Sequence, residues 1–584
     1  MADERSIESI LVADCGTVVT KLLLLERVED SYRFVSQAEA LTTINPPWND
    51  VSVGVIHAIA DIERVTGRTL YQNGHLVTPR HGQQGVDAFV VVLSAPEQLH
   101  LVLAGLVREM SLESARRAAA GTYTSVEAVL SREGSLQSPQ EVWARTVRDV
   151  APDVVLLVGG IDGGANRPVL ELADAIALGA SMLSEERRPL LLYAGNNALR
   201  SRVAKMLGEI VSVEVVDNVQ PTADTEHLGP AQETLERLYV ERRLKKTPGV
   251  DTLTAWSRLS LQTTATALGR VVEYLWHREA NPNYGALAVD VGAASTTVAA
   301  VFEGRTYLSV HGQRGVAYGP RTWAEERGIE TLMRWLPEEM EEEEVLTLLL
   351  NRELRPWTVP LELRELWVEQ AAVREMLRSA LEVGRSTWDA GKAQRHPDMM
   401  PYMDPILISG GGVVHMPRPG QALLVVLDGL QPVGISTVFL DFDRAAPALG
   451  AVAEVKPLAA ASALEAGTLV PLGTVISPVG KARDGDVILR MHIAYEDGGE
   501  LDVEARYGEL EIWPLLPGQR AILTIRPNRR FDVGLGGFGK GGKVQAIGGR
   551  VGLVVDARGR PLDLLDDPVE RRQRLTRWIW DVGG

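Results

Sequence analysis

The sequence has little cysteine, few long apolar runs and a minority of positive charge. Cys15 is the single cysteine among 584 residues, which excludes an internal disulfide and a cysteine-rich zinc site and fits a reducing compartment. No apolar run approaches the roughly 20 residues of a membrane-spanning helix, and residues 1–7 lack the features of a signal peptide. We therefore expect a cytoplasmic protein without a membrane anchor.

Basic residues are outnumbered, with 60 Lys and Arg against 77 Asp and Glu, giving a formal charge of -17. Nucleic acids and anionic membranes require a concentrated basic face, so neither is expected as the main partner. Hydrophobic residues make up 45% of the chain and charged residues 23%, which is ordinary globular composition. At this length the composition predicts several ordered domains.

The most informative feature is a repeated motif. The spacing D-x-G-x-x-x-T occurs at residues 14–20 and again at 290–296, each time between two apolar runs. This pattern predicts a strand, a tight turn and a second strand. A carboxylate at the end of a buried strand can hold hydrated Mg²⁺, and the glycine lets backbone N–H groups approach phosphate oxygens. The alternative is two ordinary hairpins in which Gly16 and Gly292 supply positive φ.

A glycine turn provides a third candidate element. A short apolar strand at 405–409 runs into Gly410, Gly411 and Gly412. Such a turn lets backbone lie flat against a ligand, although on its own it is usually only a turn. Together the three elements predict a nucleotide held between two similar lobes.

Apolar strands alternate with helical patterns between the two motifs. We expect a strand at 87–94, a helix at 96–120, and strands at 154–158 and 190–193 that end in glycine turns. This alternation predicts a mainly parallel sheet covered by helices. Asp162 follows one of these strands, where ligands bind in such sheets, and it either acts on a ligand or caps the next helix.

The middle of the chain is mostly helical. Residues 225–280 form a helical bridge between the halves, and 321–392 a helix-rich insertion whose acidic run at 338–344 starts a helix. Asp441 and Asp443 end a later strand; they bind a second cation or serve as caps and turns. A helix of small residues at 447–453 should pack tightly against the sheet.

Beyond residue 456 the composition changes to short alternating segments, which predicts an appended antiparallel β module. Its glycine-rich stretch at 534–549 is better explained by strand turns than by a phosphate loop, because no helix start follows it. The tail forms a short helix whose Trp578 and Trp580 dock on the body. The predicted domains are a first lobe at 1–245, a second lobe at 246–456 with its insertion at about 321–392, the β module at 457–562, and the tail at 563–584.

The order of these motifs resembles the actin, hexokinase and DnaK-type ATPase superfamily. A narrower resemblance, over about residues 8–455, is to the glutamate mutase L family. It is carried by LVLAGLVREMSLESARRAAAG (101–121), LLVGGIDGGANRPVLELADAI (156–176), LLYAGN (191–196) and VFLDFDRAAPALGAVA (438–453). The resemblance implies an α/β protein with duplicated actin-like, ribonuclease-H-like ATPase lobes.

The resemblance also implies a function. Members are accessory proteins, chaperones or reactivators, of adenosylcobalamin-dependent mutases, so the expected cofactors are ATP and Mg²⁺ and the expected partner is such a mutase; slow ATP hydrolysis and a homodimer are both allowed. Asp14 and Asp290 would hold Mg²⁺, and Asp162 would orient the attacking water. The residues expected to cradle phosphates are Gly16, Thr17, Thr20, Lys21, Gly292, Ser295 and Thr296, and those expected to border adenosine are Gly410, Gly411 and Gly412. A small-molecule kinase of the same fold and a non-enzymatic scaffold locked by nucleotide remain alternatives.

Overall fold

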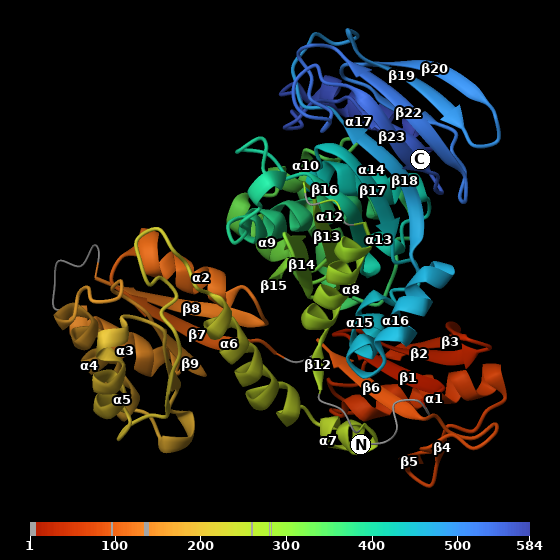
Figure 1. Cartoon of the computed structure of the whole chain (residues 1–584). Helices are drawn as coiled ribbons and strands as arrows, with labels where there is room; N and C mark the ends of the chain where they lie inside the picture. Colours follow the sequence, from red (N-terminus) through yellow and green to blue (C-terminus); the bar gives the residue numbers. More distant parts are fainter. Residues whose placement is uncertain are drawn as a thin grey trace. The chain divides into compact units, whose positions relative to one another are not determined.

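The chain divides into two compact units. The computed structural model describes residues 7–94, 97–132, 139–257, 261–279, 281 and 283–583. Unit 1 comprises Met1–Ala95 and Pro248–Gly584, and unit 2 comprises Pro96–Thr247 (Figure 1). The first lobe expected at 1–245 therefore spans two units. Unit 1 carries both copies of the repeated motif, and unit 2 carries Asp162.

The first sheet of unit 1 has the strand order β12-β6-β1-β2-β3. The first three strands along the chain form an antiparallel meander, and β6 lies parallel to β1 on its other side, followed by β12. The strands are β1 (Ser9–Cys15), β2 (Val19–Val28), β3 (Ser31–Leu41), β6 (Ala88–Leu93) and β12 (Gln262–Thr263). The strand β1 is buried along almost its whole length, as expected of a central strand with sheet on both sides.

The first five strands of the second sheet repeat this order, and three further strands extend the sheet. Its eight strands run β15-β14-β13-β16-β17-β18-β24-β21. Within it, β13, β14 and β15 form an antiparallel meander, and β16 and then β17 follow in parallel on the other side of β13. The strands are β13 (Gly285–Val291), β14 (Ser295–Phe302), β15 (Arg305–Gly312), β16 (Met403–Ser409), β17 (Gly434–Leu440), β18 (Val470–Ser477), β21 (Leu510–Trp513) and β24 (Gly552–Asp556).

The register of the two hairpins is the same as well. Cys15 lies opposite Thr20 in the first hairpin, and Val291 lies opposite Thr296 in the second. Equal strand order and equal register mean that the two halves of unit 1 are structural copies. The predicted fold class, an α/β protein with duplicated actin-like ATPase lobes, is confirmed.

Helices join the two lobes into one core. Apolar side chains from β1, β6, β13 and β14 share a single buried cluster with the helices α8 (Thr264–Glu279) and α15 (Ala446–Val455). The two helices touch at a glycine: a Cβ on Gly450 would lie 1.9 Å from the carbonyl oxygen of Ala267. The small-residue helix predicted at 447–453 thus packs tightly, and it does so mainly on another helix. The helix α16 (Pro457–Ala463) contributes to the same cluster, whereas α1 (Val51–Thr66) packs on β2 and β3 and contacts α7 (Val250–Trp256).

The helix-rich segment of the second lobe lies between β15 and β16. It contains α9 (Pro320–Arg327), α10 (Glu330–Met333), α11 (Glu342–Leu354) and α12 (Leu363–Arg385). The acidic run begins α11, where three glutamates of the first turn complement the helix dipole. The short helix α13 (Gly411–Val414) and α14 (Pro419–Leu430) then connect β16 to β17.

The C-terminal strands continue the second lobe. Strand β18 pairs antiparallel with β17, β24 pairs with β18, and β21 pairs with β24, so the predicted boundary at residue 457 is not a break in the sheet. Four further strands form a separate antiparallel sheet in the order β20-β19-β22-β23. They are β19 (Val487–Tyr495), β20 (Glu500–Arg506), β22 (Arg520–Pro527) and β23 (Gly542–Ile547). The strand β23 and its preceding turns account for much of the glycine-rich stretch.

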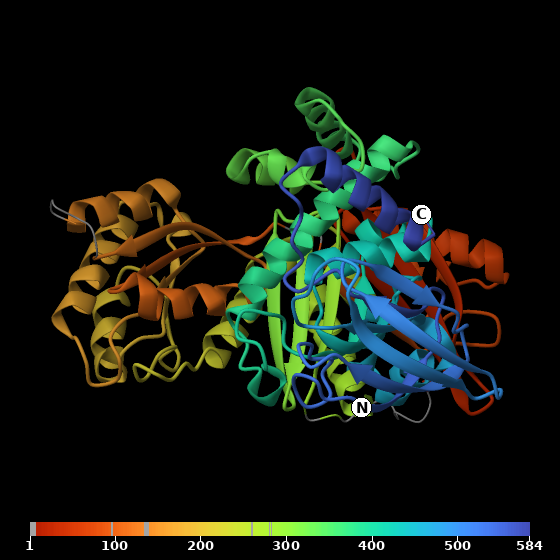
Figure 2. The same ribbon diagram turned by 90° about the horizontal axis from the view of Figure 1, so that it is seen from above.

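The C-terminal helix α17 (Pro568–Asp581) lies beside the insertion helices (Figure 2). Thr576 donates a hydrogen bond to the carbonyl of Pro337 at 3.4 Å, and Trp578 is buried. Trp580 is 71% exposed. The prediction that both tryptophans dock is therefore right for Trp578 and wrong for Trp580.

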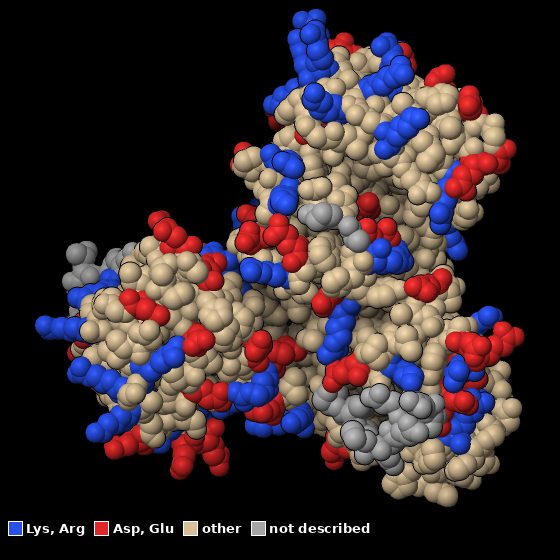
Figure 3. All heavy atoms as spheres, viewed as in Figure 1, with Lys and Arg blue, Asp and Glu red and all other residues tan. Residues whose placement is uncertain are grey.

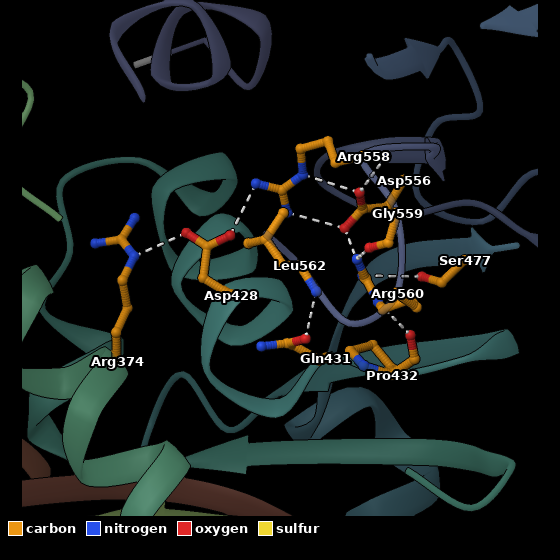
Figure 4. A network of polar contacts seen from close by, with 10 residues as sticks. All are labelled: Arg374, Asp428, Gln431, Pro432, Ser477, Asp556, Arg558, Gly559, Arg560 and Leu562. Atoms are coloured by element: carbon orange, nitrogen blue, oxygen red, sulfur yellow. Dashed lines mark hydrogen bonds and ion pairs between the residues drawn. The ribbon is translucent and has the colours of Figure 1, made fainter. Parts of the chain in front are cut away.

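A buried ionic network ties the C-terminal strands to the second lobe (Figure 4). Asp428 on α14 accepts from Arg374 on α12 at 2.7 Å and from Arg558, just beyond β24, at 2.8 Å. Asp556 accepts from Arg558 at 2.8 Å and from Arg560 at 2.6 Å. All five side chains are nearly inaccessible, so each charge depends on its partners.

Unit 2 contains one parallel sheet with the order β11-β10-β9-β7-β8. Its strands are β7 (Leu99–Gly105), β8 (Thr124–Ser131), β9 (Val154–Leu157), β10 (Leu190–Tyr193) and β11 (Val213–Val215), and its helices are α2 (Glu113–Ala119), α3 (Pro139–Val150), α4 (Arg167–Ser181), α5 (Arg200–Leu207) and α6 (Gly229–Arg242). The helix predicted at 96–120 is wrong in its first part, which is β7. A short apolar run that is buried on both sides has the same composition in a strand and in a helix.

Charges are mixed over the surface. In the view of Figure 3, Lys and Arg are interspersed with Asp and Glu over most of the visible face. Within the part of the chain that the structure describes, no helix combines the length and the apolar character needed to cross a bilayer.

Candidate nucleotide site

The first turn lies between β1 and β2. The N–H of Gly16 donates to the carbonyl of Val19 at 3.0 Å, which closes the turn. A Cβ on Gly16 would lie 3.0 Å from that same oxygen, so any side chain would crowd the turn. Asp14, at the end of the buried strand, is only partly buried.

The second turn has the same geometry. The N–H of Gly292 donates to the carbonyl of Ser295 at 2.9 Å, and a Cβ on Gly292 would lie 3.2 Å from it. Neither Gly16 nor Gly292 has a positive φ. The alternative explanation of these glycines by left-handed backbone is therefore wrong: close approach of the backbone is what requires them.

The two threonines of the motif are structural supports in this structure. Thr20 and Thr296 are both fully buried. The hydroxyl of Thr20 lies 2.9 Å from that of Thr42, which donates to the carbonyl of Gly16, and Thr296 donates to the carbonyl of Arg314 at 2.6 Å. Both hydroxyls thus brace a turn, and a direct phosphate contact by either stays a prediction.

The two motif carboxylates influence each other. Burial, together with the negative charges of Asp14 and Asp441, raises the pKa of Asp290 to about 7. Burial likewise raises the pKa of Asp14, while Lys21 and Arg444 lower it in part. Contacts in unit 1 place the two motifs in the same region. Lys21, opposite Asp14 in the first hairpin, contacts Arg444, and Arg444 lies beside the glycine turn that packs on Val291. That a nucleotide binds between the two motifs stays a prediction.

Lys21 and Arg444 link the two lobes at this place. Lys21 on β2 is buried, and its ammonium group donates to the carbonyl of Arg444, in the turn after β17. The guanidinium of Arg444 in turn pairs with Glu39 on β3. Burial lowers the pKa of Lys21, which the carboxylate of Asp14 opposes. The phosphate role of Lys21 stays a prediction. Glu39 and Arg444 were not among the predicted site residues, although Arg444 lies within the stretch 438–453 that carries the family resemblance.

Asp441 serves as a cap. Its carboxylate accepts from the N–H groups of Ala445 and Ala446 at 2.7 and 2.9 Å and from the hydroxyl of Ser409 at 2.8 Å. Of the two alternatives for Asp441 and Asp443, capping is thus what Asp441 does, at the start of α15. Its charge still contributes to the field at Asp290.

The glycine turn lies against the second motif. Gly410 has φ 93°, and a Cβ there would lie 2.3 Å from the carbonyl oxygen of Val291. A Cβ on Gly411 would lie 3.9 Å from a guanidinium nitrogen of Arg444. The three predicted elements therefore converge, although contact of Gly410, Gly411 and Gly412 with adenosine stays a prediction.

Asp162 belongs to unit 2. One of its carboxylate oxygens accepts from the N–H of Asn197 at 2.9 Å and from the side-chain amide of Asn218 at 3.0 Å. It thus joins the turns that follow β9, β10 and β11. A catalytic role for Asp162 stays a prediction.

Cys15 is fully buried, and burial together with the charge of Asp14 raises the pKa of its thiol.

The residues present suit a hydrated magnesium nucleotide. Among the described residues, no group of three or more His, Cys, Asp and Glu side chains could form a metal cage. Mg²⁺ needs fewer ligands, because it commonly keeps several waters and uses one or two carboxylates plus phosphate oxygens. Asp14 and Asp290 supply two carboxylates whose pKa values are raised mainly by burial, and a bound cation would favour their charged forms. The two turns supply backbone N–H groups between their closing hydrogen bonds.

The sequence profile of the MutL protein family matches residues 10–467. The chain belongs to this family. The match confirms the resemblance inferred from residues 8–455. The curated relative "Protein MutL" of Clostridium tetanomorphum is 24% identical over 301 residues, which are 51% of this chain and 58% of that protein. The chain thus spans little more than half the length of that relative.

Solved structures offer more distant similarities to this MutL-family chain. A nucleotide-free acetone carboxylase is 13% identical with a TM-score of 0.35, covering 85% of this chain and 81% of the other. An ATP-dependent caprolactamase from Pseudomonas jessenii is 10% identical with a TM-score of 0.31 and the same coverage. Xylulose kinase from Bifidobacterium adolescentis is 13% identical with a TM-score of 0.27, covering 80% and 96%. At such TM-scores these similarities do not establish the fold, which rests on the repeated strand order.

Proposed function

We propose that this protein is an ATP-binding accessory factor, a chaperone or reactivator, of an adenosylcobalamin-dependent mutase. One observation carries the nucleotide part of the proposal: two turns of equal geometry each follow a buried strand that ends at a carboxylate, Asp14 or Asp290. Arg444 contacts Lys21 of the first lobe and lies beside the glycine turn of the second. Membership in the MutL family, together with the resemblance to glutamate mutase L proteins, supports the accessory role and the class of client.

Different groups of the site would bind the metal ion and the phosphates. Asp14 and Asp290 would hold Mg²⁺ through its waters. The backbone N–H groups of Thr17 and Ala293, inside the two turns, would donate to phosphate oxygens. Bound Mg²⁺ neutralises part of the phosphate charge. The glycines after β16 would leave room for the nucleoside, since a side chain at Gly411 would fill the space beside Arg444.

The contacts between the lobes supply the conformational part of the mechanism. Arg444 pairs with Glu39, and Lys21 donates to the carbonyl of Arg444. A nucleotide between the two turns brings negative phosphate charge close to both cations and competes with Glu39 for them. The bound and free states then differ in how the lobes are joined, which is the two-state element that an ATP-driven accessory factor needs.

Calorimetry with Mg·ATP and co-purification with the client test the proposal. Wild type should bind Mg·ATP and retain a cobalamin-dependent mutase from native extract. Asp290→Ala should bind Mg·ATP at least about tenfold more weakly, because it removes a carboxylate from the metal shell. Asp30→Ala is the matched control, since Asp30 is fully exposed at the far end of the first hairpin. Equal affinities of Asp290→Ala and Asp30→Ala would refute the site.

The same measurements separate the alternative functions. ATP consumption that requires an added hydroxyl substrate would identify a small-molecule kinase. Tight binding with turnover no faster than in buffer would identify a scaffold that nucleotide only locks. Failure of any mutase to associate would refute the accessory role while leaving the nucleotide site intact.

A further inference from the structure

A cavity lies in the second lobe, away from the two turns. It has a volume of about 1010 Å³ and is formed by α9, α10, α12, the segment 394–400, the end of α14 and the turn at residues 560–561. This volume is at the upper end of the range for small-molecule sites. None of the motif residues of the nucleotide site lines it.

The cavity wall carries excess positive charge. Five arginines line it, against the three carboxylates of Glu375, Glu382 and Asp398. The arginines are Arg327, Arg334, Arg378, Arg385 and Arg560. In a chain with a formal charge of -17, a concave surface with two extra positive charges runs against the overall trend. Such a wall raises the local concentration of anions.

Several of these guanidinium groups are incompletely paired. Arg334 donates to Glu375 at 2.6 Å, but its Nε is buried and has no hydrogen-bond partner. The same carboxylate oxygen also accepts from the indole of Trp335 at 2.6 Å. Arg378 reaches that oxygen only at 3.9 Å, beyond hydrogen-bond distance. That oxygen therefore accepts from two donors, and no hydrogen bond of Arg378 is found among the described residues, which leaves donor capacity for a ligand.

The buried network fixes the fifth arginine in the wall. Arg560 is held by Asp556 and by the carbonyl of Pro432, at 2.6 and 2.9 Å (Figure 4). The other members of the network, two arginines and two aspartates, balance one another, so the charge of Arg560 is the net charge that the network presents to the cavity. A charge held in so rigid a frame contributes to the field without needing to be ordered by the ligand.

The other part of the wall is apolar. Trp323, Trp388, Met399 and Met400 line the same cavity. The ring of Trp323 also lies beneath the guanidinium of Arg327, 5.4 Å from its centroid. An anion that enters this cavity can therefore place an apolar or aromatic body against these side chains.

We propose that this cavity binds a small compound in which a compact dianion, a phosphate ester or a dicarboxylate, is attached to an apolar body. Arg334 and Arg378 are the principal anion contacts, because they have spare donors. The proposal is independent of the nucleotide site and of the mutase role.

Titration calorimetry of the full-length protein with phenyl phosphate and with phenylsuccinate as probes tests it. Wild type should bind one of the two, and the preferred probe identifies the type of dianion. Arg378→Gln should weaken binding about tenfold, since it removes a charged donor. Glu382→Gln should strengthen it about threefold, since it removes a like charge from the wall. Arg490→Gln, an exposed arginine of β19, is the matched control and should bind as wild type does.

Other outcomes overturn the proposal. No binding of either probe up to its solubility limit would do so, as would equal affinities of Arg378→Gln and Arg490→Gln. Benzyl alcohol binding as well as phenyl phosphate would show that the wall recognises only the apolar body. If Mg·ATP competes with the probe, the probe binds at the nucleotide site and the proposal is wrong. If the probe binds Asp290→Ala as tightly as it binds wild type, it does not bind at the nucleotide site.

Discussion

The affinity for Mg·ATP should depend on pH through Asp290. Burial, reinforced by Asp14 and Asp441, raises the pKa of this carboxyl to about 7. A proton on Asp290 removes the negative charge that the metal needs, so protons and Mg²⁺ compete. Lowering the pH from 8 to 6 should therefore weaken binding, and raising it above 8 should change little.

The size of the effect follows from the titration. With a pKa of about 7, about nine in ten of the molecules carry ionised Asp290 at pH 8 and about one in ten at pH 6. The apparent affinity should thus fall about tenfold between these values, which corresponds to about 1.4 kcal/mol. Asp14 titrates in the same cluster, so the measured midpoint belongs to the pair.

Titration calorimetry at pH 6, 7 and 8 measures this, with Asp290→Asn as the reference. The terminal phosphate of the nucleotide itself titrates near pH 6, so part of any pH dependence is not from the protein. Asp290→Asn should bind weakly at every pH and keep only that residual slope. If the affinity of wild type changes with pH no more than that of Asp290→Asn, the reasoning is refuted, because Asp290 would then not titrate in this range.

Three further substitutions test other parts of the structure. Asp428→Ala should cost about 3–5 kcal/mol of stability and lower the melting temperature, because Arg558 loses a buried counter-charge; an unchanged melting temperature would contradict this. Gly450→Val should greatly reduce the yield of folded protein, since its side chain would collide with the backbone of Ala267, and a wild-type circular dichroism melt would speak against that packing. Asp162→Asn should slow ATP turnover without changing affinity if Asp162 orients water, and unchanged steady-state turnover would leave it as a structural tie between turns.

The strongest predictions from the sequence were local ones. Both hairpins follow from short apolar runs separated by a tight turn, whereas the strand order around them was not predicted. The sequence also showed the repetition itself, because equal spacing at 14–20 and 290–296 does not depend on tertiary contacts. Family membership could also be inferred from the sequence, because the similarity lies in contiguous stretches and does not depend on tertiary contacts.

Only the tertiary structure decided which distant residues meet. Arg444 comes to Glu39 and Lys21 because the turn after β17 packs against the first lobe, and nothing near it in sequence indicates this. The strand at 99–105 could not be told from a helix, since burial on both sides hides the period of the side chains. The C-terminal strands join the second lobe through pairing between β17 and β18, and register across a sheet is set by partners rather than by either strand alone. The arginine cavity likewise gathers side chains from residues 323 to 561, so charge could be counted from the sequence but not placed.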